Sequence, residues 1–437
     1  MEIMQTLKPF ESIWNFVLLL LVSYPILGAF AWFIGVLCYQ LIYRHRHKDD
    51  IEFKQLTPAE QPFITIMIPA HNEEVMIEHT INYLMNNLNY EKYEVLVTDD
   101  GSTDETPAIL ERLQNVYDNL RVVTIKKNQG KAHAFNVGVG FARGEVILSN
   151  DADSIPEPDA LWKYMSYFMG EEHANTAAVT ANMDVQNRST IIAKSQTVEF
   201  SSIVGVIKRS QVSALGNMYA YSGANTMYRR DALIDVGLFR QDRATEDISI
   251  AWDHQLNGWT TVFSPDILFY MNVPENLDAL YHQRKRWAKG GTEVLLTNFK
   301  RVVSHPGKYL KQWAFITDQT LSIIWSLFFF VSTLIFLISL VTFFFTGNYE
   351  RVYHMFCMAF IFVTFEMFAG VLQLLSALIV DDRGRKFKYL IFMPLYMLIY
   401  WQVNALALVT TLIPAVKTIL GYGSGTWVSP VRKHHTE

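Results

Sequence analysis

The chain has 437 residues, of which 50% are hydrophobic, 14% aromatic and only 18% charged. This composition is too apolar for an ordinary soluble protein and too polar for a chain that lies wholly in lipid, so we expect one soluble domain and several membrane-spanning helices. The net charge of −5 gives no sign of a nucleic-acid-binding protein. The two cysteines, Cys38 and Cys357, lie in apolar segments, which excludes a disulfide framework.

The first apolar segment, Ile13–Ile42, carries no charged residue and is long enough to cross a bilayer as one tilted or kinked helix. The basic segment RHRHK (Arg44–Lys48) follows at once. Because excess arginine and lysine beside a span marks the cytoplasmic side of a membrane, we expect the following domain to lie in the cytoplasm.

A soluble α/β domain is predicted next, because short apolar runs alternate with helical patterns. The predicted strands are Phe63–Ile68, Tyr93–Thr98, Arg121–Ile125 and Glu145–Ser149, and the predicted helices between them lie near Glu74–Leu88, Asp104–Tyr117 and Lys131–Ala142. This alternation indicates βαβ units and a parallel sheet. In such sheets, ligands bind at the carboxyl ends of the strands.

Three further apolar stretches follow the domain: Leu321–Phe345, Val352–Val380 and Tyr389–Ile413. The basic residues of Asp381–Lys388 (DDRGRKFK), between the last two, favour the cytoplasmic side. We therefore divide the chain into an N-terminal membrane segment with its basic flank (1–50), a cytoplasmic domain (51–300) and C-terminal interfacial and membrane helices with about three spans (301–437).

Polar residues gather where the predicted strands end. The first strand leads into Pro69–Glu74 (PAHNEE) and the second into Thr98–Thr106 (TDDGSTDET). Asp100 is placed to accept a hydrogen bond from a nucleotide base. Helix capping explains Asp104, but it does not explain Asp99 and Asp100.

Two further strand ends carry groups suited to a diphosphate. Lys131 follows a glycine at a predicted helix start, where backbone N–H groups and a cation can hold a phosphate, although the spacing is not that of a P-loop. Asp151 and Asp153 flank one alanine after the fourth strand and provide two hard oxygen ligands for Mg²⁺ or Mn²⁺.

Two later motifs have a structural and a functional interpretation. Thr245–Asp247 (TED) precedes a helical run, so it is either a helix cap with acidic first-turn residues or a site that supplies a general base. Gln283–Trp287 (QRKRW) lies before a membrane span, so its tryptophan and arginines are either interface anchors or substrate-binding groups.

Taken together and in this order, the motifs resemble processive glycosyltransferases of family 2, the group of cellulose, chitin and hyaluronan synthases. Within that group the chain is most similar to bacterial poly-β-1,6-N-acetyl-D-glucosamine synthases, and the likeness covers nearly the whole chain. The segments that carry it are Gln196–Gln211, Arg230–Phe239, Val273–Gly291 and Gly425–Arg432. Asn150 and the segment Ser222–Thr226 (SGANT) depart from the family's pattern, which concerns the acceptor site more than the donor chemistry.

The resemblance implies a GT-A (Rossmann-like) domain, embedded between transmembrane helices, that transfers a sugar from a UDP-sugar with inversion and with a divalent cation, Mg²⁺ or Mn²⁺. Donor-binding roles are implied for Ala70, Glu73, Asp99, Asp100, Lys131 and Asp151. Asp151 and Asp153 are the implied metal-facing pair, and Asp247 is the implied general base with Glu246 beside it. Gln283, Arg286 and Trp287 are the implied acceptor-binding residues.

The expected product is therefore poly-β-1,6-N-acetylglucosamine, a biofilm exopolysaccharide, made by a multi-pass protein of the cell membrane and coupled to export. The expected partners are the donor, the growing polysaccharide, the lipid bilayer and a small accessory membrane subunit. Three alternatives stay open: a hyaluronan- or chitin-type synthase, an enzyme that transfers one sugar to a lipid carrier, and a transporter or receptor with a nucleotide-sensing domain.

Overall fold

The structure is a computed structural model that describes residues 2–46, 57 and 60–422. The segment Gly425–Arg432 and the last residues of Arg44–Lys48 lie outside the described residues. Within the described residues, one sheet of eight strands forms the centre of the soluble domain, in the order β3-β2-β1-β4-β7-β6-β8-β5.

The first half of the sheet confirms the predicted βαβ units. Its strands are β1 (Ile64–Ala70), β2 (Tyr93–Asp100), β3 (Leu120–Ile125) and β4 (Val146–Ser149), all mutually parallel, and the helices between them are α3 (Ile77–Asn87), α4 (Thr106–Gln114) and α5 (Lys131–Phe141). Every residue of β1 and β2 is buried, because helices cover the sheet and the apolar strands lie inside the domain. The carboxyl ends of these strands therefore meet at one edge.

The second half of the sheet corrects the prediction of a parallel sheet, because the sheet is mixed. Strand β7 is antiparallel to both of its neighbours, β4 and β6, and β5 is antiparallel to β8, whereas β6 and β8 are parallel. Short strands give no sequence signal for their direction, which depends on how the intervening chain returns to the sheet. The elements here are β5 (Ile155–Pro156), α6 (Ala160–Met165), η3 (Glu171–His173), β6 (Thr176–Val185), β7 (Thr226–Arg229), α9 (Arg230–Asp235), α10 (Glu246–Leu256) and β8 (Thr260–Met271).

Helices that were not predicted from the sequence connect the sheet to the apolar helices. They are α7 (Ile191–Phe200), the π-helix η4 (Ser201–Ile207), α8 (Lys208–Leu215) and the long helix α11 (Leu277–Val303). Both α7 and α11 begin at side-chain caps: Thr190 accepts a hydrogen bond from Ala193 N, and Asn276 accepts one from Ala279 N.

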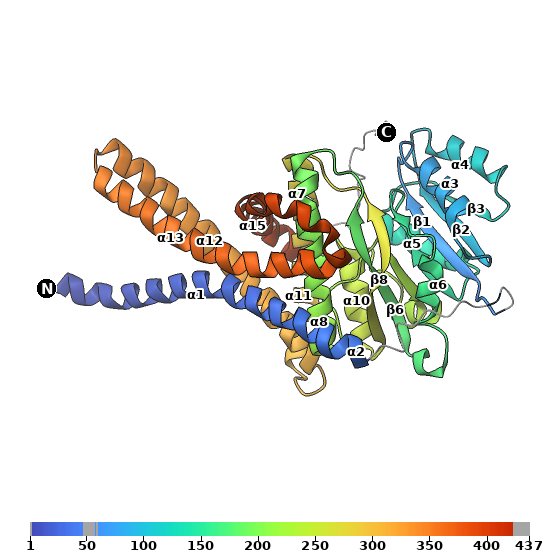
Figure 1. Ribbon diagram of the computed structural model, residues 1–437, viewed down its shortest axis with the longest axis horizontal. Helices are drawn as coiled ribbons and strands as arrows, with labels where there is room; N and C mark the ends of the chain where they lie inside the picture. The colour runs from blue at the N-terminus through green and yellow to red at the C-terminus, as the bar shows by residue number, and fades with distance from the viewer. Residues whose placement is uncertain (1, 47–56, 58–59, 423–437) are drawn as a thin grey trace.

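Four helical segments of the described chain are long and apolar enough to cross a membrane: Asn15–Tyr43, Leu310–Phe345, Tyr349–Val380 and Arg385–Ile419. They overlap the four predicted apolar segments, and their large hydrophobic side chains are widely exposed, as expected of a surface that lipid covers. The protein is thus a membrane protein. The elements are α1 (Glu2–Cys38), η1 (Tyr39–Tyr43), α2 (Arg44–Arg46), α12 (Leu310–Phe345), α13 (Tyr349–Val380), η5 (Asp381–Phe392), α14 (Met393–Leu395), η6 (Tyr396–Tyr400) and α15 (Trp401–Ile419). Figure 1 shows α12 and α13 side by side, extending away from the sheet domain.

The N-terminal helix packs on the soluble domain through a close backbone contact. A Cβ atom added to Gly35 of α1 would lie 2.5 Å from the Cβ of Ser210 in α8, so only glycine allows this approach. The Ser210 hydroxyl donates to the carbonyl of Trp32 at 3.0 Å. At the end of the helix, Arg44 lies 3.8 Å from Asp266 of β8. The first membrane helix and the sheet are therefore in direct contact.

Candidate active site

The carboxyl ends of β1 and β2 bring predicted donor-binding residues together. Ala70 and Asp99 are partners in the parallel register of the two strands, and Asp100 follows. Oδ1 of Asp99 accepts a hydrogen bond from Ser102 N at 3.0 Å, which holds the turn after β2. Glu73 is 3% exposed, and its backbone N donates to Thr106 Oγ1 at 2.9 Å.

Asp100 connects β2 to the start of α5. Its Oδ2 accepts hydrogen bonds from Gly130 N at 2.8 Å and from Gln129 N at 3.1 Å. Gly101 has a φ of +69°, and a Cβ there would lie 2.9 Å from Asn128 N, so the turn requires glycine. The two loops that end β2 and precede Lys131 are thus held together by one carboxylate.

Helix capping, the alternative for the acidic residues of these loops, applies only in part. Oδ1 of Asp104 accepts a hydrogen bond from Thr106 N at 3.0 Å at the start of α4. At the start of α10, by contrast, the Thr245 side chain makes no capping bond, and its hydroxyl has no partner among the described residues. The capping explanation of Thr245–Asp247 is therefore wrong for the threonine.

Lys131 lies at the centre of the site. Its Nζ is 2.7 Å from Oδ1 of Asp151 and 3.2 Å from Oε1 of Glu246, and it donates to the carbonyl of Gly223 at 3.3 Å. Burial disfavours the ammonium, but Asp151 and Glu246 outweigh this effect and raise the pKa of Lys131. The lysine therefore stays protonated and joins two motifs that are 95 residues apart in the sequence, the diaspartate and TED.

Asp247 is half-buried beside this group. Its Oδ2 accepts a hydrogen bond from Gly223 N at 3.0 Å, and its Oδ1 accepts one from Ile248 N at 2.9 Å. Burial raises the pKa of Asp247, and the adjacent Glu246 carboxylate raises it further, although Lys131 and Arg286 lower it. A raised pKa suits a carboxylate that must take up a proton near neutral pH.

Gly223 is a residue of this site that the sequence analysis did not assign. A Cβ at this position would lie 3.1 Å from both Glu246 Oε1 and Lys131 Nζ, and 3.4 Å from Asp247 Oδ2. It belongs to the segment Ser222–Thr226, which the sequence analysis had noted as unusual. Three charged side chains can meet around its backbone because it has no side chain of its own.

Lys208 of α8 is a second unassigned residue, and it lies within electrostatic range of Asp247. It is 7% exposed, and it has no hydrogen bond or ion pair to any residue that the structure describes. Burial lowers the pKa of the Lys208 amine to about 8, although the Asp247 carboxylate raises it. The sequence signal for it was weak, because Lys-Arg pairs are common at helix surfaces.

Helix α11 brings the QRKRW motif to the same region. Arg286 acts electrostatically on both Lys131 and Asp247. Gln283 and Trp287 are half-buried on this helix, and Oε1 of Gln283 has no partner among the described residues.

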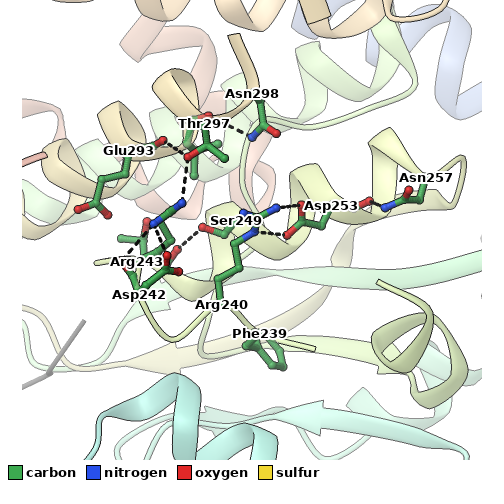
Figure 2. Close-up of polar contacts among 12 residues, drawn as sticks. Phe239, Arg240, Asp242, Arg243, Ser249, Asp253, Asn257, Glu293, Thr297 and Asn298 are labelled. Atoms are coloured by element: carbon green, nitrogen blue, oxygen red, sulfur yellow. Dashed lines mark hydrogen bonds and ion pairs between the residues drawn. The ribbon is translucent and has the colours of Figure 1, made fainter. Parts of the chain in front are cut away.

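A network of ion pairs and hydrogen bonds holds the loop before Thr245 against α10 and α11. Figure 2 shows the guanidinium of Arg240 bound to both carboxylate oxygens of Asp253, at 2.8 Å each. Arg243 Nη2 donates to Thr297 Oγ1 of α11 at 3.2 Å. The position of the TED motif therefore depends on both helices.

The structure thus brings Lys131, Asp151, Glu246 and Asp247 together, with Arg286 in electrostatic range. Asp153 is 6% exposed and follows the same strand end as Asp151. Among the described residues, no group of three or more His, Cys, Asp or Glu side chains could hold a metal ion. A site of two protein carboxylates that is completed by a substrate's phosphates needs no such group.

A half-parallel sheet with a lysine and carboxylates at its strand ends, joined to apolar helices, defines a membrane glycosyltransferase of GT-A type. The model of the family "Glycosyl transferase family 2" matches residues 65–237. The chain is 32% identical, over 96% of its own length and 98% of the relative's, to the poly-β-1,6-N-acetyl-D-glucosamine synthase of Staphylococcus epidermidis. It is 33% identical, over 94% of its own length and 97% of the relative's, to that of Staphylococcus aureus strain COL. The chain belongs to the poly-β-1,6-N-acetyl-D-glucosamine synthase family within glycosyl transferase family 2.

A solved structure supports the fold. The mannosyltransferase PcManGT from Pyrobaculum calidifontis, solved in complex with GDP-Man and Mn²⁺, superposes with a TM-score of 0.51 over 87% of this chain and 99% of that one. The two sequences are 19% identical. This likeness confirms the GT-A-type fold and extends beyond the sheet.

Proposed function

We propose that this protein polymerises N-acetylglucosamine from UDP-N-acetylglucosamine into poly-β-1,6-N-acetylglucosamine, an exopolysaccharide of biofilms. The observation that carries the proposal is Lys131, bound to Asp151 and Glu246 beside the half-buried Asp247, in a chain that is similar to such synthases over 96% of its length. The enzyme is an inverting N-acetylglucosaminyltransferase.

The transfer is a single displacement at the anomeric carbon. The 6-hydroxyl oxygen of the acceptor sugar forms a bond to C1 of the donor sugar while the bond from C1 to the diphosphate oxygen breaks. The electron pair leaves with UDP, and the hydroxyl proton passes to Asp247. Attack from the side opposite to the leaving group converts the α-linked donor into a β-linkage, so no second carboxylate is needed as a nucleophile.

The donor lies along the carboxyl ends of β1, β2 and β4. Ala70, Glu73, Asp99 and Asp100 hold uridine, and Lys131 and Asp151 face the diphosphate. Negative charge develops on the departing UDP, and the Lys131 ammonium stabilises it. This requires Lys131 to exchange its present contact with a carboxylate for a phosphate oxygen.

The donor set of the site fits a divalent cation. Asp151 and Asp153 provide hard oxygen ligands, and the carboxylates of Glu246 and Asp247 add negative charge that Lys131 alone does not balance. When bound, Mg²⁺ or Mn²⁺ neutralises charge on the diphosphate.

The acceptor is the end of the growing polymer. Trp287 offers an apolar ring face to the last sugar of the polymer, and Gln283 and Arg286 border this acceptor-binding site. Because α11 continues toward the membrane helices, the polymer can leave between them as it lengthens, which couples synthesis to export. Glu366, an ionisable residue in the apolar helix α13, either faces this path or binds a small accessory subunit.

The catalytic domain lies on the cytoplasmic side. The basic residue Arg44 follows the first span, and the basic loop between the last two spans contacts the same domain: Lys386 lies 3.1 Å from Asp184 of β6.

The test uses membranes that contain only this chain, incubated with radiolabelled UDP-N-acetylglucosamine and Mg²⁺ or Mn²⁺. We expect a long product that a β-1,6-specific glucosaminidase digests, and we expect it to be lost in Asp247→Asn and after chelation with EDTA. A single transferred sugar would indicate a lipid-carrier enzyme, and a polymer that resists this enzyme would indicate another synthase. Nucleotide binding without turnover would support a sensing domain.

Trp287→Ala tests the acceptor role. Loss of the ring removes the sugar-binding face, so we expect no polymer, while the variant still enters the membrane. Fractionation of cells checks this, and loss of the variant from the membrane fraction would show that Trp287 is an interface anchor instead.

A further inference from the structure

One face of the Trp287 ring is already covered within the protein. The guanidinium carbon of Arg284, one turn earlier in α11, lies 4.1 Å from the ring centroid. This is the geometry of a cation–π contact, in which the planar guanidinium lies over the aromatic face. An acceptor sugar that stacks on Trp287 is therefore restricted to the other face.

Arg284 is held in this place by a residue of another helix. Its Nη2 lies 2.5 Å from Oε2 of Glu199 in α7, and the two residues are 3% and 0% exposed. Glu199 lies 85 residues before Arg284 in the sequence. The orientation of the Trp287 ring thus depends, through one ion pair, on the helix that precedes the π-helix η4.

A contribution to folding stability does not explain the ion pair between Glu199 and Arg284. Oε1 of Glu199 and both Nε and Nη1 of Arg284 are buried without a hydrogen-bond partner among the described residues. A buried ion pair with unsatisfied atoms commonly contributes no more to stability than apolar residues of similar volume. Burial raises the pKa of Glu199 although Arg284 lowers it, so the surroundings disfavour the ionised carboxylate that the ion pair needs. Such a pair calls for a functional explanation.

We propose that Glu199 is a positioning residue for the acceptor: it holds the Arg284 guanidinium flat against one face of Trp287, so that only the opposite face receives the terminal sugar of the polymer. This inference rests on the proposed function. It assigns Glu199 and Arg284 no contact with the donor and no part in proton transfer. Their loss therefore weakens acceptor binding and leaves donor binding unchanged.

The experiment measures two KM values on the full-length protein in lipid nanodiscs, one for UDP-N-acetylglucosamine and one for a β-1,6-linked N-acetylglucosamine oligomer as the acceptor. For Glu199→Gln we expect the acceptor KM to rise about tenfold, because the variant loses a desolvated cation–π contact. We expect the donor KM to stay within about twofold of the value for the unmodified protein. The matched control is Glu94→Gln. Glu94 is also buried and ion-paired, to Arg121 at 2.8 Å, but it lies at the amino end of β2, away from the site.

Arg284→Lys separates positioning from a merely structural ion pair. Lysine keeps a positive charge beside Glu199 but lacks the planar group that covers the ring, so we expect the same rise in acceptor KM. We also expect Glu199→Gln to have little further effect in a Trp287→Phe background, because both changes act on one contact.

Several results would overturn the proposal. The first is an unchanged acceptor KM in Glu199→Gln, and the second is an equal rise of the acceptor and donor KM values in that variant. The third is an acceptor KM of Arg284→Lys equal to that of the unmodified protein. If Glu199→Gln does not fold, the result for Arg284→Lys decides. Failure of the proposed function looks different, because the unmodified protein would then not extend the oligomer.

Discussion

At the scale of single residues, the site depends on charged groups that meet only when the chain is folded. Lys131 lies between Asp151 and Glu246, and Asp247 is hydrogen-bonded to the backbone of Gly223. None of these residues is close to the others in sequence, except for the adjacent pair Glu246 and Asp247. Their protonation follows from this arrangement: Lys131 stays charged, and the pKa of Asp247 is raised.

The pH dependence of transfer should report the raised pKa of Asp247. The base accepts a proton only when it is ionised, so kcat/KM should fall as the pH drops through its pKa. Because burial and Glu246 raise that pKa, the fall should begin at a higher pH than for an ordinary aspartate, whose pKa is about 3.9. The measurement is kcat/KM as a function of pH, from initial rates of UDP release at pH values from about 4.5 to about 8. A fall that begins only where an ordinary aspartate titrates would argue against Asp247 as the base.

At the scale of elements, the site depends on how closely α11 approaches the start of α10. A Cβ added to Gly290 would lie 1.9 Å from Oγ1 of Thr245, and one added to Gly291 would lie 2.9 Å from the hydroxyl of Tyr219. The two glycines that follow QRKRW therefore set the distance between α11 and the TED motif.

Gly290→Ala should displace Thr245 and the acidic residues that follow it. A shift of about 1 Å in a catalytic group commonly costs about 100-fold in rate, so we expect a loss of that order in polymer synthesis, with the protein still folded and inserted. Radiolabel incorporation measures it. The control is Gly140→Ala in α5, where an added Cβ meets no atom within 4 Å. Equal activity of the two variants would contradict this account of the packing.

At the scale of the whole molecule, a buried charge network joins the loop between the last two apolar segments to the sheet domain. Lys386 Nζ lies 2.7 Å from Asp381 Oδ2 and 3.1 Å from Asp184 Oδ1, and Asn182 of β6 donates to Asp381 at 2.8 Å. Burial alone would raise the pKa of Asp381, but Lys386 and Arg209 outweigh it and lower the pKa. The last apolar segments and the sheet domain are thus linked through ionic contacts.

Lys386→Met should weaken this link. Two buried carboxylates would lose their shared cation, and breaking such a contact costs about 3 kcal/mol of stability. We expect a lower midpoint of thermal unfolding in detergent and faster proteolysis within residues 381–388. Lys388→Met, on an exposed residue of the same segment, is the control and should change neither. If both variants behave alike, the network does not hold the loop.

Much of the fold could be predicted because its signals are local. The four parallel strands, the helices between them and the apolar segments each follow from a local run of hydrophobic residues. Such a run is buried in a protein core or placed in lipid whatever the rest of the chain does. The antiparallel strand β7 and the helices α7 and α11 could not be predicted in the same way. Their place depends on contacts with distant segments, such as Gly290 with Thr245 and Glu199 with Arg284.

The sequence by itself determined the kinds of groups in the site, because an ammonium, a diaspartate and an acidic helix start each have a chemistry that does not depend on position. It also determined the division into a soluble domain and membrane helices. Only the tertiary structure decided which groups meet: Lys131 with Asp151 and Glu246, the backbone of Gly223 with Asp247, and Glu199 with Arg284. Such contacts act over a few ångströms and join residues up to 115 positions apart, as Lys131 and Glu246 are, so they exist only once the sheet and the helices around it have packed together.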